Sequence, residues 1–347
     1  MFSMHGVWGL RLASLVAVLS LSAESLFAGT ARAADFYADK KLIVVVGSAV
    51  GGGYDQYARV FGRHIAKHIP GNPTTIVQNM PGAGSVTAAR YLDGNAPKDG
   101  TVVVSFNSSL IAASLTAPET VNMKFTDVTW IGAMTHEFRV CYAWHETGLK
   151  SWDDLKNAKK QYVVGVTGTG TSGYVNGALL HNLFGIDIRQ VLGYTGSAQQ
   201  KLAIERGELD GSCTEWNTLP ANWIEGKKIY PLMRWLKETP TGFDYPGAPY
   251  VGDLAPTAEA KAIVELLGAP GELGNPFAAS KQVPAERIAI LRAAFDKMIE
   301  DSELKDELAK MHQPLEPTSG RKAEEITASI YATATPELIA KAKAAMQ

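Results

Sequence analysis

Glycine and hydroxyl residues that follow two apolar runs are the best candidates for chemistry in this chain. Gly168-Thr-Gly-Thr-Ser-Gly173 has the spacing G-x-G-x-x-G, and Gly51-Gly-Gly53 stands directly before Tyr54 and Asp55. Both clusters precede a helical pattern, so their backbone N–H groups and the helix dipole would form a site for an anion. Alternatively, either loop serves only as a tight turn or helix cap.

The G-x-G-x-x-G spacing also suggests a dinucleotide-binding enzyme. That class needs an acidic residue about 20 positions later, at the end of the second strand, to bind the ribose. Here that strand ends at Leu192-Gly-Tyr194 without an acid, and Asp187 precedes it. We therefore predict a ligand-binding loop rather than an NAD-type dehydrogenase, and no cofactor.

Other catalytic patterns are missing from the sequence, which contains neither G-x-S-x-G nor H-E-x-x-H. His64 and His68 have the i, i+4 spacing of metal ligands, but the negative end of a helix dipole explains them better. His136 or Glu215 would be the acid or base of an exported enzyme acting on a carboxylate, yet neither has a visible partner. We therefore expect no catalytic residues and no metal.

Repeated strand–loop–helix units must position the two loops. Apolar runs occur at 41–46, 74–78 and 101–106, and again at 161–166, 189–194, 208–214 and 229–235. This alternation predicts two open, mainly parallel sheets with helices on both faces, and Pro284 begins a last group of helices. Ligands of such sheets bind beyond the carboxyl ends of the strands, so two facing domains would share one cleft and close it by hinge motion.

The composition is that of an ordinary globular protein with room for two cores. The 347 residues are 46% hydrophobic and 20% charged, with a formal net charge of −2. Charge this sparse and balanced argues against intrinsic disorder and against a nucleic-acid partner.

Residues 1–33 have the pattern of a signal peptide. Arg11 precedes an apolar run at 12–21, and Ala31-Arg32-Ala33 is a small-x-small cleavage site. A helix of about ten residues spans roughly 15 Å, which is half of a bilayer core. We expect cleavage after about Ala33 and export to a bacterial periplasm.

Export makes a disulfide between Cys141 and Cys213 chemically accessible, because the periplasm is oxidising. Both residues lie in expected strands, which would allow them to pair if the strands are neighbours. Two buried thiols are the alternative.

Six segments, in order along the chain, resemble the solute-binding receptors of tripartite tricarboxylate transporters, also called Bug proteins. The first, at 50–59, has glycines followed by an aspartate and Ala-Arg, and the second, at 78–85, contains Asn-x-Pro-Gly-Ala-Gly. The others lie at 96–100, 165–172, 194–197 and 207–210. The resemblance therefore covers nearly the whole mature chain.

The resemblance implies a periplasmic binding protein-like type II fold, in which two α/β domains enclose an interdomain ligand cleft. The implied domains are residues 34–136 together with 237–347, and residues 137–236. The implied function is that of a periplasmic, monomeric, non-enzymatic receptor for a di- or tricarboxylate or an aromatic acid. Its implied partners are the membrane permease subunits of a tripartite tricarboxylate transporter, or a sensor kinase.

By position, the resemblance assigns ligand binding to main-chain amides and hydroxyls of four loops. These residues are Gly52, Gly53, Tyr54 and Asp55; Asn107 and Ser108; Thr167, Thr169, Gly170, Thr171 and Ser172; and Tyr194, Thr195 and Gly196. Asp55 has an alternative role as a cap of the helix that begins beside it.

Departures from the family pattern bear on the ligand. Thr195 stands where a lysine or arginine is common, and Tyr174 where a histidine is common. Tyr174, Tyr54, Trp216 and Phe106 together predict a cleft lined by rings, which would suit an aromatic or longer-chain carboxylate.

Arg139 is the one cation near the expected domain crossover. Such a residue would pair with a ligand carboxylate. A salt-bridged or solvated arginine is the alternative.

Overall fold

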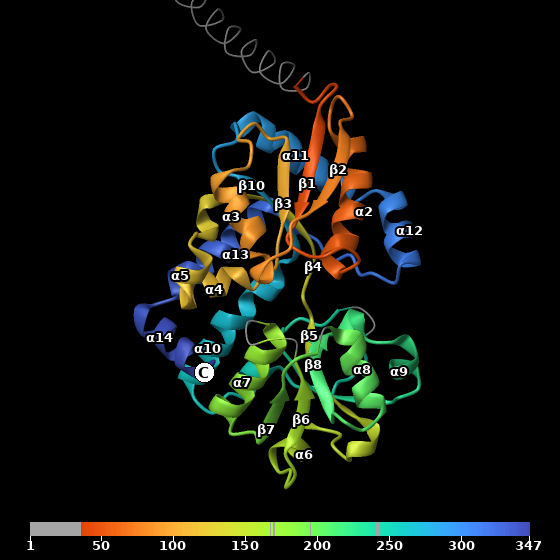
Figure 1. The fold of residues 1–347 in the computed structure, drawn as a ribbon, viewed down its shortest axis with the longest axis vertical. Coiled ribbons are helices and arrows are strands. Elements are labelled where there is room, and N and C mark those ends of the chain that lie inside the picture. Colours follow the sequence, from red (N-terminus) through yellow and green to blue (C-terminus); the bar gives the residue numbers. More distant parts are fainter. Residues whose placement is uncertain (1–35, 167, 169–170, 195, 241–242) are drawn as a thin grey trace, which may run out of the picture.

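The chain folds into two sheets that belong to two lobes, drawn one above the other in Figure 1. The computed structural model describes residues 36–166, 168, 171–194, 196–240 and 243–347. The predicted signal peptide and four predicted site residues, Thr167, Thr169, Gly170 and Thr195, lie outside the described residues. None of the described helices is long and apolar enough to cross a membrane.

The sheet of the first lobe has the strand order β11-β4-β10-β3-β1-β2. Its strand β1 (Lys41–Val46) pairs in parallel with β2 (Thr74–Asn79) and β3 (Val102–Ser105). Strand β10 (Gly274–Ser280) is antiparallel to β3 and to β4 (Val128–Thr135), and β11 (Thr318–Ser319) is antiparallel to β4. The helices of this lobe are α2 (Gly53–His68), α3 (Val86–Gly94), α4 (Leu110–Thr116), α5 (Pro118–Val121), α11 (Ala285–Met298), α12 (Ser302–Lys310) and α13 (Gly320–Thr333).

The sheet of the second lobe has the strand order β7-β6-β8-β5-β9. Strand β6 (Tyr162–Gly165) is parallel to β7 (Ile188–Val191) and β8 (Gly211–Glu215), whereas β5 (Arg139–Trp144) is antiparallel to β8 and β9 (Ile229–Arg234). Its helices are α6 (Trp152–Lys156), α7 (Ser172–Phe184), α8 (Ser197–Glu205) and α9 (Ala221–Glu225). Short 3₁₀ turns in the chain lie at Ala83–Ser85, Phe125–Asp127, His145–Thr147, Trp216–Thr218, Val251–Asp253 and Ala269–Glu272.

The predicted fold class of two α/β domains is confirmed, but both sheets are mixed rather than mainly parallel. The chain leaves the first lobe after β4 and returns after β9. Each crossing brings the chain into the next sheet at the edge where the parallel strands of that sheet have their carboxyl ends. The first strand that it enters, β5 or β10, therefore runs antiparallel to those strands. The predicted domain boundaries lie in these two crossings and stay a prediction.

The last helices of the chain connect the two lobes. Helix α14 (Pro336–Ala345) contacts α4 of the first lobe, α7 of the second, and α10 (Ala258–Gly268). The Asn182 amide on α7 donates a hydrogen bond to the carbonyl of Ala345 at 2.9 Å. The predicted group of helices that begins at Pro284 is confirmed by α11 to α14.

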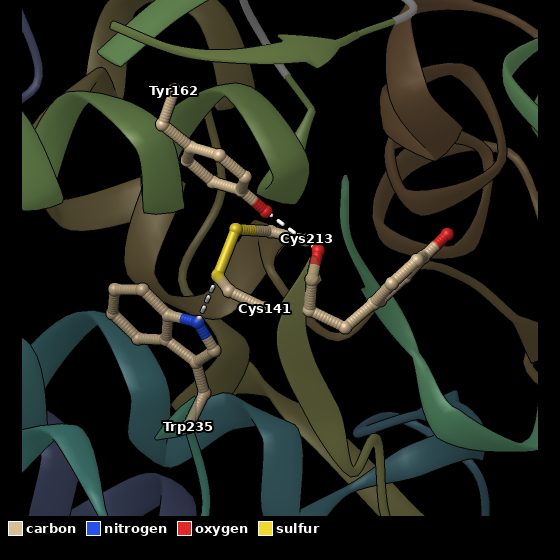
Figure 2. Close-up of a disulfide and its surroundings, with 5 residues drawn as sticks. Cys141, Tyr162, Cys213 and Trp235 are labelled. Atoms are coloured by element: carbon tan, nitrogen blue, oxygen red, sulfur yellow. Dashed lines mark hydrogen bonds between the residues drawn. A yellow bond between two sulfur atoms is a disulfide. The ribbon is translucent and has the colours of Figure 1, made fainter. Parts of the chain in front are cut away.

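Cys141 and Cys213 form a disulfide, which resolves the choice that the sequence left open (Figure 2). They occupy facing positions on the antiparallel strands β5 and β8, so strand pairing itself brings them together. The Trp235 indole N–H points at the sulfur of Cys141 at 3.3 Å, and the Tyr162 hydroxyl donates to the Tyr142 carbonyl at 2.7 Å. The bridge is therefore buried in the second lobe.

Candidate functional site

A chamber of about 240 Å³ lies between the two lobes at the carboxyl ends of their parallel strands. The first lobe contributes Gly84 and Asn107, and the second lobe contributes all the other lining residues. Those others are Arg139, Gly165, Val166, Thr171, Ser172, Gly173, Ser197, Gln200, Cys213 and Thr214. Among the described lining residues, Arg139 alone carries a charge, and most of the rest offer hydroxyl, amide or glycine main-chain groups.

The first turns of two helices form the wall of the second lobe. Helix α7 begins at Ser172 and α8 begins at Ser197, and neither start receives a side-chain cap from the described residues. The Thr171 hydroxyl instead donates to the Gly168 carbonyl at 2.7 Å, which shapes the loop. The first N–H groups of a helix have no intrahelical partner, and the helix dipole adds a partial positive charge there. This wall is therefore suited to an anion.

The loop between β1 and α2 is held together by Asp55. The buried carboxylate of this residue accepts hydrogen bonds from the Gly51 amide at 2.8 Å, the Asn79 amide at 2.8 Å and Arg59 at 3.0 Å. Burial acts to raise the Asp55 pKa, but the bonds from Arg59, Gly51 and Asn79 outweigh it and lower that pKa. Both carboxylate oxygens are thus engaged by the loop, α2 and the end of β2, so Asp55 positions the loop.

Of the predicted site residues, the structure brings Asn107, Thr171 and Ser172 together in the chamber lining. The described residues that do not line it are Gly52, Gly53, Tyr54, Asp55, Ser108, Tyr194 and Gly196. The ligand-binding role of all these residues stays a prediction.

Sequence reasoning missed Ser197, Gln200 and Thr214, which line the chamber. Ser197 and Gln200 lie in the first turn of α8, and Ser197 is the last residue of the family-like segment at 194–197. The start of a helix after a glycine is a signal that would have identified both residues. Thr214 follows Cys213 at the end of β8, and no comparable local signal marks it.

A buried cluster of charges lies where the chain crosses between the lobes. Glu137 lies between β4 and β5, and its two carboxylate oxygens have different partners. One oxygen accepts a hydrogen bond from the Tyr54 hydroxyl of the first lobe, and the other lies 2.8 Å from the Arg139 guanidinium. Arg139 also lies 3.3 Å from Glu215 at the end of β8. Arg139 is thus salt-bridged and also lines the chamber.

The cluster contains one cation, Arg139, and two carboxyl groups. This imbalance of charge contributes to shifts in the pKa of three of its groups. Burial, opposed by Arg139 and reinforced by Glu137, raises the pKa of Glu215 to about 7. Burial together with Glu137 and Glu215 also raises the pKa of the Tyr54 phenol, so it remains a donor. The Arg139 pKa is raised by both glutamates against the effect of burial, so the guanidinium is a permanent cation.

We predict that the loss of the Glu215 proton lowers the stability of the protein as the pH rises. The unfolded carboxyl has a pKa near 4.5, so between pH 4.5 and pH 7 the folded state binds the proton more tightly. The free energy of unfolding therefore decreases over this window and stays lower above it. Because the side chain is 30% exposed, solvent screening limits the loss to about 1–2 kcal/mol.

Urea unfolding at pH 5 and pH 8 measures this loss, with Glu215→Gln as the matched control. The glutamine amide cannot ionise. The free energy of unfolding of the variant, relative to that of the wild type, should therefore increase from pH 5 to pH 8. A difference between the two proteins that stays constant with pH would contradict the assignment.

The prediction of an aromatic lining is wrong for Phe106 and Trp216. Phe106 is fully buried and packs against Phe125 and Trp130, with ring centroids 5.1 and 5.7 Å apart. Trp216 packs its ring edge-on against Phe243 at 4.9 Å. Both rings belong to cores. The Tyr54 hydroxyl donates a hydrogen bond to Glu137. Tyr174 is half-buried and does not line the chamber.

His64 and His68 on α2 bond to carboxylates of α12 rather than to the end of their own helix. His64 lies 2.7 Å from Glu307, and His68 lies 3.1 Å from Asp301. The ligand atoms of His64, Asp301 and Glu303 lie within 4.8 Å of one another. Lys67 already pairs with Glu303 there. These contacts give both histidines a structural role in joining α2 to α12.

Comparison with known proteins identifies the fold through structure and not through sequence. Neither a protein-family model nor a curated protein sequence matches this chain. A TctC solute-binding protein from Polaromonas is similar in structure, with a TM-score of 0.66 and 20% identity, covering 88% of this chain and 99% of its own.

Two solved structures from Rhodopseudomonas palustris are similar to a comparable degree. MatC with bound malate has a TM-score of 0.61 and 18% identity, covering 88% of this chain and 99% of its own. A second protein, with adipate, has a TM-score of 0.63 and 17% identity, covering 88% and 97%. The two lobes, their crossings and the chamber between them thus give this chain the fold of the TctC-type periplasmic solute-binding proteins.

Proposed function

We propose that this protein is a solute-binding receptor that captures a small carboxylate in the chamber between its lobes. The observation that carries this proposal is the lining of the chamber. It combines one permanent cation, Arg139, with the uncapped starts of α7 and α8. Backbone N–H groups and hydroxyls at helix starts bind anions, and a guanidinium adds directional bonds to a carboxylate.

The size of the chamber and the way the chain crosses between lobes suit such a receptor. A volume of about 240 Å³ fits a small acid rather than a drug-sized ligand or a dinucleotide. The crossings after β4 and β9 provide hinges about which one lobe can close on the other. The malate and adipate bound by two proteins of the same fold support a small aliphatic acid as ligand.

Location and partner complete the proposal. Residues 1–33 direct export to the periplasm, where the protein acts as a monomer and binds its ligand without chemical change. The liganded form delivers the acid to the membrane permease of a tripartite tricarboxylate-type transporter. A sensor kinase is the alternative recipient of the same liganded form.

A thermal-shift screen with malate, succinate, adipate, citrate and the monocarboxylate pentanoate tests ligand binding. A ligand at 100 times its dissociation constant stabilises the folded state by about 2.7 kcal/mol, so we expect the matching acid to raise Tm by about 5 °C. Succinamide is the matched control, because it keeps the shape of succinate without its charges. Equal shifts with acid and amide, or no shift with any acid, would contradict the proposal.

A further inference from the structure

A second cavity, of about 100 Å³, opens beside the chamber and has a different character. Its walls come from α4, α7 and the C-terminal segment, which includes α10 and the residue after α14. The apolar part of the lining includes Ala112, Leu179, Leu236, Leu267 and Met346. It therefore offers a small apolar space between the lobes.

This cavity adjoins the chamber, because Arg139 and Ser172 line both spaces. The only charged residues of its described lining are Arg139 and Glu137, and they are paired with each other. A carboxylate at this junction would reach the guanidinium and the start of α7 together. Whatever is attached to that carboxylate can extend into the apolar space.

The cavity volume and its charges define what can enter. A cavity of about 150 Å³ with apolar walls holds a benzene ring, so 100 Å³ holds an alkyl group of about three or four carbons. A second carboxylate would meet Glu137 there without a free cation to offset it. The cavity thus selects an apolar substituent and rejects a second acid.

We propose that this cavity is a side pocket of the ligand chamber that takes the short alkyl group of an aliphatic carboxylate, whose acid group lies at Arg139 and Ser172. The inference rests on the proposed carboxylate-binding function and makes it specific. The preferred ligands are acids with one carboxylate and a chain of three or four further carbons. Citrate, whose substituents are all polar, is a poor ligand.

Calorimetry with the straight-chain acids from acetate to octanoate tests the side pocket. Each buried methylene adds about fourfold in affinity, so the affinity should rise from acetate to pentanoate and then stop rising. The substitution Leu179→Ala removes three carbons from the wall and should extend the rise to about heptanoate or octanoate. The substitution Ala112→Leu fills the space and should end the rise at about propionate.

Leu180→Ala is the matched control, because Leu180 is equally buried on α7 but does not line the cavity. This variant should be destabilised as much as Leu179→Ala while keeping the wild-type preference for pentanoate.

The two proposals fail in different ways in this experiment. If acids bind with affinities that do not depend on chain length, or if Leu179→Ala and Leu180→Ala respond alike, the side pocket is wrong and the receptor function stands. If no monocarboxylate binds while malate or citrate does, the side pocket is again wrong. If no acid of either kind binds, both proposals are wrong.

Discussion

Replacing both cysteines, as Cys141→Ala/Cys213→Ala, is expected to lower the free energy of unfolding by about 4 kcal/mol. The bridge joins residues 72 positions apart, and a chain cross-linked over that distance loses much of its unfolded-state entropy. The native state places the two residues at facing positions of β5 and β8 regardless of the bridge. Its loss should therefore act mainly on the unfolded chain.

Guanidinium unfolding with and without a thiol reductant measures this effect. Reductant should lower the free energy of unfolding of the wild type to the value of the alanine variant, and it should leave the value of the variant unchanged. Thiol titration of the denatured, unreduced wild type should find no free thiol. Two free thiols, or an equal response of both proteins to reductant, would contradict the disulfide.

The substitution Arg139→Met is expected to destabilise the protein by about 3–5 kcal/mol, because it leaves buried carboxyl groups without their cation. Glu137 is the residue most affected, since its side chain is only 4% exposed and its remaining side-chain partner is the Tyr54 hydroxyl. Methionine keeps the length and apolar stem of arginine, so the loss reports charge rather than volume. Urea unfolding at pH 7 measures it.

A neutral version of the cluster separates stability from ligand binding. The triple variant Glu137→Gln/Arg139→Met/Glu215→Gln contains no unpaired charge, so it should recover most of the lost stability. If Arg139 also binds the ligand carboxylate, this folded variant should still bind acids at least tenfold more weakly than the wild type. If the triple variant binds acids as tightly as the wild type, Arg139 serves only in its salt bridges and does not bind the ligand. No recovery of stability would contradict the charge argument.

The strands and the helix starts could be predicted because they depend on local patterns. The run Lys41–Val46 is apolar at every position after the first, and the structure buries both of its faces between helices. The glycine-rich segments at 51–53 and 168–173 extend into the first residues of α2 and α7, so the helices start where expected. Near-neighbour preferences and burial decide such features, so a sequence displays them directly.

The candidate site was only partly visible in the sequence. Asn107, Thr171 and Ser172 were predicted, whereas Ser197, Gln200 and Thr214 were not. Aromatic residues misled the interpretation of the ligand, because Phe106 and Trp216 look the same in sequence whether they face a cleft or a core. Only the packing of Phe106 on Trp130 and of Trp216 on Phe243 distinguishes these cases.

The sequence by itself determined the two-domain α/β class, and it predicts an export signal and loops with the chemistry of an anion site. Tertiary structure alone decided the strand directions, the disulfide and the charge cluster. Arg139 and Glu215 are 76 positions apart, and the side cavity joins α4 to Met346 at the end of the chain. The physical reason is that contacts between distant segments form only when lobes pack, and no local preference encodes which groups then meet.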